Sequence, residues 1–352
     1  MPPKPPYAER PVDHIQVLDY RARKSRPGRR LDGYLAAKFH NYSRTLLTGL
    51  IREGKVTVNG RAVKPHYEIK RNDRVHVELP VFARHTLTPE NIPIDVLHED
   101  EHVLVINKPA DIIVHPARAH LTGTLVNALV YYCDSLPESE DKVRPGIVHR
   151  LDRDTTGVMV VVKDAASRGW IGRQFEWRRV KKEYVAVVEG EMELDADRIA
   201  LPLGRHKKHP EKMAVDRAAG RKAVTVYHVL ERFRGFTYVR LELKTGRTHQ
   251  IRVHLAAIGH PVACDSQYGR RAELYLSDLV GEKAGASAGD APGPSEVEPH
   301  VEGEEPIIHR QALHARTIGF NHPGTREFAE YTAPLPADLE RLLGALREHR
   351  GL

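Results

Sequence analysis

The residues best suited to chemistry lie in one charged turn, residues 149–154, which reads His-Arg-Leu-Asp-Arg-Asp. An apolar run at residues 158–162 follows it and predicts a strand that would hold the turn in place. Asp152 is flanked by Arg150 and Arg153. Nearby cations keep a carboxylate ionised, and an ionised carboxylate can act as a nucleophile. Taken alone, however, such a turn would favour a plain solvated loop.

The turn is not isolated, because further short motifs accompany it along the chain. They are Ile106-Asn107-Lys108-Pro109, Val114-His115-Pro116, Lys182-Glu183-Tyr184, Thr245-Gly246-Arg247-Thr248-His249-Gln250-Ile251-Arg252-Val253-His254 and Leu313-His314-Ala315. In this order the motifs resemble those of the RluA-type pseudouridine synthases, over most of the chain beyond about Pro93. Several ordered motifs are a more specific signal than one short pattern. The chain departs from the family at Asp111, where members usually carry Gly.

The resemblance implies that uridine in RNA is isomerised to pseudouridine, with the base detached from the sugar, turned and rejoined through carbon. Asp152 matches the family's essential aspartate, Arg252 its basic partner, and Tyr184 the tyrosine that stacks on the target base. Arg150 matches the residue that enters the RNA stack when the uridine flips out. Arg247 is a rival to Arg252 and an alternative phosphate contact. Attack at the anomeric carbon, attack on the base and elimination to a glycal all stay open, since each needs this carboxylate.

The same resemblance implies an α+β fold for residues 93–352, built on a mixed, largely antiparallel sheet. The sequence patterns agree with it. Alternating or apolar runs predict strands, and periodic runs predict helices. The expected strands include residues 102–106, 184–188, 224–230 and 238–243, and the expected helices include residues 124–132 and 248–258.

Residues 29–80 predict a small module of two helices and a hairpin, with an Asn-Gly turn at residues 59–60. The phrase Glu-Gly-Lys-Val-Thr-Val-Asn-Gly at residues 53–60 resembles the αL RNA-binding module found in a small-subunit ribosomal protein and in tyrosyl-tRNA synthetase. In that module, basic residues face RNA phosphates. The residues that match in position and charge are Arg44, Arg52, Lys55 and Arg61.

Charge is distributed unevenly along the chain. Residues 1–80 hold 17 Lys and Arg against 8 Asp and Glu, whereas the whole chain has a net charge of +7. We expect residues 1–28 to be a flexible basic arm, residues 81–92 a connector, and residues 281–305 a disordered acidic insertion. The strongly basic segment at residues 1–80, joined to a chain that is mildly basic outside residues 281–305, favours a polyanionic binding partner.

Composition and the lack of certain sequence patterns limit the classes of protein to which this chain can belong. No apolar run approaches the roughly 18 residues that a membrane span needs, and residues 1–6 lack the apolar core of a signal peptide. The two cysteines, Cys133 and Cys264, form no zinc or disulfide pattern, which suits a reducing cytoplasm. His249 and His254 lie five apart with no supporting motif, so we expect no metal. We expect no cofactor either, because no nucleotide-binding pattern is present.

The sequence therefore predicts a monomeric, cytoplasmic RNA pseudouridine synthase without a membrane partner. Its expected substrate is large-subunit ribosomal RNA, because relatives with this front module mostly modify that RNA. Transfer RNA is the alternative substrate. A non-catalytic RNA-binding or ribosome-assembly protein on the same fold, and a nucleoside N-glycosidase that releases free base, are the alternative functions.

Overall fold

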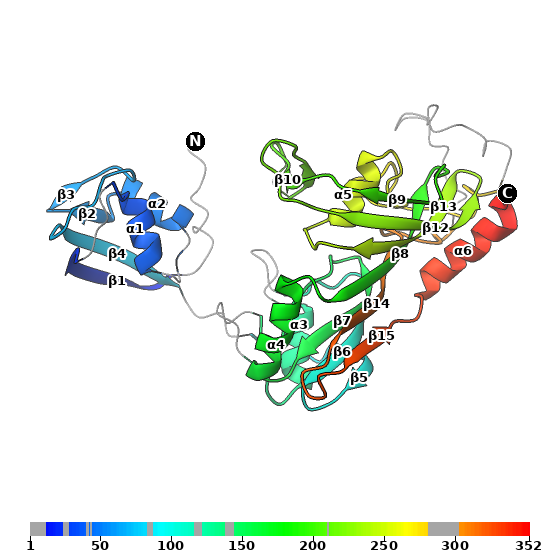
Figure 1. Ribbon diagram of the computed structural model, residues 1–352, viewed down its shortest axis with the longest axis horizontal. Coiled ribbons are helices and arrows are strands. Elements are labelled where there is room, and N and C mark those ends of the chain that lie inside the picture. The colour runs from blue at the N-terminus through cyan, green and yellow to red at the C-terminus, as the bar shows by residue number, and fades with distance from the viewer. Residues whose placement is uncertain are drawn as a thin grey trace. The chain divides into compact units, whose positions relative to one another are not determined.

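The computed structural model describes the chain as two compact units, Met1–Thr86 and Leu87–Leu352. Within them the structure describes residues 12–23, 28–39, 42, 44–82, 87–115, 122–137, 144–209, 211–280 and 303–352. Each unit has its own apolar core. Figure 1 traces both units in chain order.

The front unit is a four-stranded antiparallel sheet in the order β1-β4-β2-β3 with two helices (Figure 1). Its elements are β1 Val12–Arg21, α1 Leu31–Lys38, α2 Arg44–Arg52, β2 Val56–Val58, β3 Arg61–Ala62 and β4 Arg74–Phe82. Helix α2 buries one face, Leu46, Leu47, Leu50 and Ile51, as the leucine spacing predicts. The turn between β2 and β3 has positive φ at both Asn59 and Gly60, as Asn-Gly hairpins require.

Strand β1 corrects the expectation of a flexible basic arm over residues 1–28. Residues 12–21 form a long strand that pairs with β4 along its whole length. Leu18, Tyr20 and Ala22 pack on the core of the front unit, whereas Ile15 and Val17 are exposed. This alternation was present in the sequence, but the surrounding prolines and charges obscured it. Residues 1–11 and 24–27 of the expected arm lie outside the described residues.

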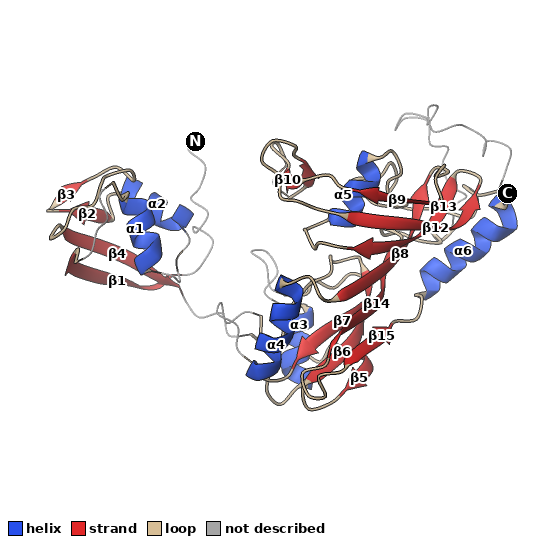
Figure 2. Ribbon diagram, in the orientation of Figure 1, coloured by secondary structure: helices blue, strands red, loops and turns tan. Residues whose placement is uncertain are grey.

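The large unit is built on one nine-stranded sheet in the order β5-β6-β7-β14-β8-β13-β12-β9, with β15 paired to β14 (Figure 2). All its pairings are antiparallel except that of β7 with β14. The expected mixed, largely antiparallel α+β fold is therefore confirmed. Its strands are β5 Asp95–Glu99, β6 Val103–Lys108, β7 Thr156–Val162, β8 Lys181–Glu189, β9 Ala196–Ile199, β12 Thr225–Phe233, β13 Phe236–Leu243, β14 Leu313–Asn321 and β15 Phe328–Thr332.

The parallel pairing of β7 with β14 depends on a glycine. Gly157 pairs with Ala315, and a Cβ added to Gly157 would lie 2.2 Å from the Ala315 carbonyl oxygen. Its φ of 115° is also one that L residues rarely adopt. Only glycine therefore lets these two strands meet at the middle of the sheet, directly after the charged turn.

Four helices and a small hairpin complete the large unit: α3 Leu125–Tyr132, α4 Ala165–Glu176, α5 Gln250–Ala257, α6 Ala337–Arg350, and the pair β10 Leu203–Arg205 with β11 Met213–Val215. Thr124 and Asp164 cap α3 and α4 by accepting backbone N–H groups, as their side chains favour. Helix α5 lies against β11 and β12, and α4 lies against β7 and β14.

Of two boundary expectations, one needs adjustment and the other stays a prediction. The expected connector at residues 81–92 begins inside β4, and Leu87 and Ile92 pack on the core of the large unit. The expected acidic insertion at residues 281–305 lies outside the described residues except for its last three positions. Among the described helices, none combines the length and apolar character needed to span a membrane.

Candidate active site

The charged turn is anchored from both ends before β7 begins. Leu151 is buried in the core, and the Nε2 atom of His149 accepts the Val160 N–H at 3.0 Å. The His149 ring stacks on Phe175, and burial lowers its pKa to about 3, so this histidine is neutral and structural. The turn closes where the Thr155 N–H donates to the Asp152 carbonyl oxygen at 3.2 Å.

A fully buried lysine lies beneath the turn. The ammonium group of Lys108 donates to the carbonyl oxygens of Pro109, Ile112 and Arg153 at 2.7, 3.1 and 2.7 Å. Burial lowers its pKa to about 7, and the charge of Asp154 opposes that shift. All three donors of the ammonium group are therefore used to fix backbone, which leaves Lys108 a structural role.

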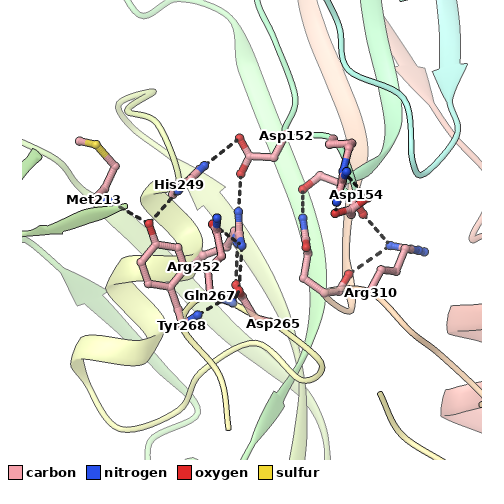
Figure 3. A network of polar contacts seen from close by, with 12 residues as sticks. Asp152, Asp154, Met213, His249, Arg252, Asp265, Gln267, Tyr268 and Arg310 are labelled. Atoms are coloured by element: carbon pink, nitrogen blue, oxygen red, sulfur yellow. Dashed lines mark hydrogen bonds and ion pairs between the residues drawn. The ribbon is translucent and has the colours of Figure 1, made fainter. Parts of the chain in front are cut away.

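Arg310 and Gln311 brace the same turn from the start of β14. Arg310 pairs in bidentate fashion with Asp338 at 2.7 and 2.8 Å. It also donates to the Asp154 carbonyl oxygen at 3.2 Å (Figure 3). Gln311 donates to the Thr155 hydroxyl at 3.2 Å. Side chains from two distant segments thus hold the backbone that carries Asp152.

Helix α5 carries the facing side of the site, and a buried glutamine fixes where it begins. The Gln250 side chain accepts from the Thr245 hydroxyl at 2.7 Å and from the Arg247 N–H at 3.1 Å. It also donates to the Val224 carbonyl oxygen at 3.0 Å. These bonds lock the turn before the helix, so that residues 249 and 252, one helical turn apart, both point toward the charged turn.

Arg252 joins Asp152 to a second, deeper carboxylate (Figure 3). Its Nε and Nη2 atoms donate to Asp265 at 2.6 and 2.8 Å, and Nη2 also donates to Gln267 at 3.1 Å. Its Nη1 atom donates to the Oδ2 atom of Asp152 at 3.2 Å. Burial lowers the pKa of Arg252, but the bonds and charge of Asp265, with Asp152, raise it above its usual value. The guanidinium is therefore a permanently charged, rigid donor.

The second oxygen of Asp152 faces His249. The Nε2 atom of His249 lies 3.8 Å from the Oδ1 atom of Asp152, and its Nδ1 atom lies 2.7 Å from the Tyr268 hydroxyl. That hydroxyl accepts the Met213 N–H at 2.8 Å. Burial lowers the pKa of His249, the charge of Asp152 opposes the shift, and that of Arg252 adds to it.

Tyr184 lies on β8, where Ala315 of β14 and Leu241 of β13 flank it. Its exposed fraction is 9%. Burial raises the pKa of the Tyr184 phenol above its usual range. The negative charge of Asp152 raises it further, so the two side chains interact electrostatically. Tyr184 is therefore a neutral phenol at neutral pH.

Lys182 precedes Tyr184 by two residues on the same strand. A Cβ added to Gly246 would lie 3.5 Å from its Nζ atom, so the lysine reaches the turn before α5. Burial, aided by the charge of Arg178, lowers the Lys182 pKa to about 8. No carboxylate contacts it within the part of the chain that the structure describes.

The other predicted residues do not converge on Asp152. Arg150 is exposed, and Arg247 donates through Nε to the Lys222 carbonyl oxygen at 3.3 Å. In the front unit, Arg44, Arg52, Lys55 and Arg61 are all exposed. Of these, Arg44 contacts Asp32 at 3.1 Å and Lys55 contacts Glu78 at 3.0 Å.

Comparison with known proteins explains the arrangement. Residues 102–257 match the family model of RNA pseudouridylate synthases, and residues 29–75 match that of the S4 domain. The chain is 40% identical to an uncharacterized RNA pseudouridine synthase of Bacillus subtilis, YlyB, over 95% of this chain and all of that protein. This chain belongs to the RNA pseudouridine synthases.

Two further relatives agree with this membership. Ribosomal large subunit pseudouridine synthase D of Pseudomonas aeruginosa is 40% identical over 92% of this chain and 93% of its own length. The solved structure of human RNA pseudouridylate synthase domain containing 4 matches 72% of this chain and 93% of its own, with 26% identity and a TM-score of 0.51. The synthase and S4 regions fall in the large and the front unit, respectively.

Among the described residues of this synthase, one group has the composition of a metal site. His98, Asp100 and His322 place their ligand atoms within 4.8 Å of one another. The Nδ1 atom of His322 accepts the Gly324 and Thr325 N–H groups at 3.2 and 3.4 Å, so the proton of the neutral ring resides on Nε2, 2.8 Å from Asp100. A ligating histidine donates through its other nitrogen, whereas the Nδ1 atom of His322 accepts, so His322 does not have the hydrogen bonding of a metal ligand.

Sequence reasoning missed the residues behind the carboxylate of this synthase. Asp265, Gln267 and Tyr268 contact Arg252 or His249, yet they follow α5 in a short loop with no recognised motif. The sequence raised His249 only as a possible metal ligand, which its spacing from His254 did not support. The one signal available was an unexplained Asp-Ser-Gln-Tyr-Gly run at residues 265–269. A pairing across this loop can be seen only in three dimensions.

Proposed function

We propose that this synthase isomerises specific uridines of large-subunit ribosomal RNA to pseudouridine, using Asp152 as the reacting carboxylate. The observation that carries the proposal is the placement of Asp152, whose Oδ2 atom is contacted by a buried arginine while its side chain stays 19% exposed. A reacting carboxylate must be held rigidly and still reach substrate. Asp152 combines both properties.

In this proposal Arg252 aims Asp152 and balances its charge, which suits each of the three chemical routes. Tyr184 stacks on the target base. Because its pKa is raised, by burial first and by Asp152 second, it begins the reaction as a neutral phenol and not as a base. Arg150, exposed on the same turn as Asp152, enters the RNA stack as the uridine leaves it.

RNA binding in the proposal uses two sets of exposed cations. The first is on the front unit and comprises Arg44, Arg52, Lys55 and Arg61. The second, on the β10–β11 hairpin and the turn after it, comprises Arg205, Lys207, Lys208, Arg217, Arg221 and Lys222, and Arg247 adjoins it through Lys222. In the proposal such residues contact phosphates and place the substrate, whereas the residues around Asp152 select the base.

The choice of ribosomal RNA is supported by relatives in several bacteria that are named ribosomal large subunit pseudouridine synthase D. We also propose that the protein acts in the cytoplasm as a monomer. Light scattering of the purified protein with and without RNA tests the monomer, and localisation of a tagged chain in cells tests the compartment.

The test uses large-subunit ribosomal RNA, small-subunit ribosomal RNA and transfer RNA, each labelled with tritium at uridine C5. Tritium release together with mapped pseudouridine only in the large-subunit RNA is the expected result. Release only from transfer RNA would move the substrate to that alternative. Binding without release would indicate a non-catalytic protein, and free uracil among the products would indicate an N-glycosidase.

A further inference from the structure

The carboxylate of Asp152 has two oxygens, and each faces a different residue of the α5 segment. The Oδ2 atom accepts from Arg252, and the Oδ1 atom lies 3.8 Å from the Nε2 atom of His249 (Figure 3). We propose that His249 is a second positioning residue for Asp152, and that Tyr268 sets the tautomer with which it acts. The inference rests on the proposed function of Asp152.

The hydrogen bonds of Tyr268 determine where the His249 proton resides. The Tyr268 hydroxyl accepts the Met213 N–H at 2.8 Å, so its own proton is free to donate. Among the described residues, the acceptor for that proton is the Nδ1 atom of His249, at 2.7 Å. A neutral imidazole that accepts at Nδ1 carries its proton on Nε2, and this N–H points at Asp152.

The distance of 3.8 Å between His249 Nε2 and Asp152 Oδ1 is too long for a hydrogen bond. In the free protein the His249 N–H therefore lies near the carboxylate without donating to it. A shift of less than about 1 Å would close it to hydrogen-bonding distance. Catalytic hydrogen bonds often tighten only when substrate is bound. His249 would then fix the second oxygen of Asp152 and prevent rotation of the carboxylate about its bond to Cβ.

Tyr268 also connects this contact to the basic β10–β11 hairpin. Two groups of the hairpin segment contact this loop. The Met213 N–H donates to the Tyr268 hydroxyl, and the Lys212 ammonium donates to the Gln267 carbonyl oxygen at 2.8 Å. Met213 and Val215 pack with Tyr268 on a small apolar cluster that includes Val253 of α5. RNA held by the exposed hairpin cations would therefore stabilise the loop that sets the His249 tautomer.

The experiment measures the single-turnover rate constant at saturating RNA, and RNA affinity separately, for substitutions at both residues. His249 has a left-handed φ of 53°, which asparagine tolerates, so His249→Asn preserves the backbone but cannot reach Asp152. We expect it to slow the chemical step about tenfold to a hundredfold, as for loss of a hydrogen bond to a charged group, with affinity unchanged within about twofold. His249→Gln offers an N–H at similar reach and should recover part of the rate.

Tyr268→Phe keeps the ring beside His249 and Arg252 but removes the hydroxyl. We expect a slower chemical step, and no further loss when it is combined with His249→Asn, because Tyr268 acts through His249. Tyr275→Phe in the same loop segment removes an exposed hydroxyl bonded to Glu273 and is the matched control.

Two outcomes would overturn the inference once the wild-type protein has been shown to form pseudouridine. One is a folded His249→Asn variant whose single-turnover rate stays within about twofold of wild type. The other is a double variant in which the two losses multiply, which would mean that Tyr268 does not work through His249. If His249→Asn fails to fold, Tyr268→Phe takes its place, and a folded Tyr268→Phe variant with a single-turnover rate within about twofold of wild type would overturn the inference.

Discussion

The two units use arginine and lysine in opposite ways. In the front unit, the Arg44 side chain is 59% exposed and makes one ion pair, with Asp32. In the large unit, Arg252 is 5% exposed and donates to Asp265, Gln267 and Asp152. Exposed ion pairs contribute little stability and are screened by salt, so cations such as Arg44 remain available to phosphates.

The buried guanidinium of Arg252 has a different role, because its hydrogen bonds fix its position. Removing Arg252 would leave the Asp265 carboxylate, whose side chain is fully buried, without its partner. In our proposal, exposed cations, including those of the front unit, hold RNA. The buried charge of Arg252 in the large unit instead fixes where individual atoms lie. Substitutions in the two units should therefore separate affinity from chemistry.

The largest effect is expected for Asp152→Asn. The amide keeps the shape of the side chain but loses its charge and nucleophilicity, so pseudouridine formation should fall by more than about a thousandfold. RNA affinity should persist, because none of the proposed phosphate contacts changes. Tritium release measures pseudouridine formation, and a binding titration measures RNA affinity. Near-normal activity would shift the assignment to Asp154.

Substitution of Arg252 should lower turnover far more than affinity. Arg252→Met also leaves the buried Asp265 carboxylate without its ion-pair partner and should destabilise the large unit by about 3–5 kcal/mol. Arg252→Lys keeps the charge and separates the two effects, because it should fold and yet turn over slowly without the bidentate pairing. Arg247→Met is the control. If it slows turnover as much, the choice between the two arginines was wrong.

Deletion of residues 1–86 tests the other side of the comparison. The large unit has its own core, so it should fold and retain residual activity on a short stem-loop at high protein concentration. Binding to long RNA should weaken about tenfold or more. Its salt dependence should become less steep, by about 0.7 in the logarithmic slope for each phosphate that the front unit would otherwise neutralise. Equal slopes for both proteins would show that the front unit does not touch RNA.

A moderate, pH-dependent effect is expected at Lys182. Burial, aided by Arg178, lowers its pKa to about 8, so the side chain is charged below that pH and neutral above it. If its charge contributes to RNA binding beside Tyr184, affinity should decrease by about tenfold or less as pH rises through 8. Lys182→Met should bind RNA more weakly at pH 7, and its affinity should not fall as pH rises through 8. The Lys55→Met variant should still show that fall in affinity.

The smallest effects are expected from single exposed cations of the front unit. Arg52→Ala or Arg61→Ala should weaken long-RNA binding by about twofold to fivefold and lower the logarithmic salt slope by about 0.7 each. The single-turnover rate constant at saturating RNA should not change. A variant that slowed chemistry while leaving affinity intact would contradict the division of labour between the units.

Much of the fold and part of the site could be predicted from the sequence. The helix expected at residues 124–132 and the Asn-Gly turn at residues 59–60 rest on local signals, and both are confirmed by the structure. The order of the motifs indicated the family, and the contact between Asp152 and Arg252, which are 100 residues apart, was expected from it. Strand β1 was missed because the prolines and charges around it obscured the alternation of its residues.

By itself, the sequence determined the residue types, the local elements and the family to which they belong, since those depend on neighbours within a few positions. Only the tertiary structure decided what supports the carboxylate. Lys108, Arg310, Asp265 and Tyr268 act through contacts between segments that are separate in the sequence, and no local pattern encodes such hydrogen bonds. The sequence does not show that one basic residue will be buried and another exposed. Only the fold decides that one holds backbone in place while the other stays at the surface.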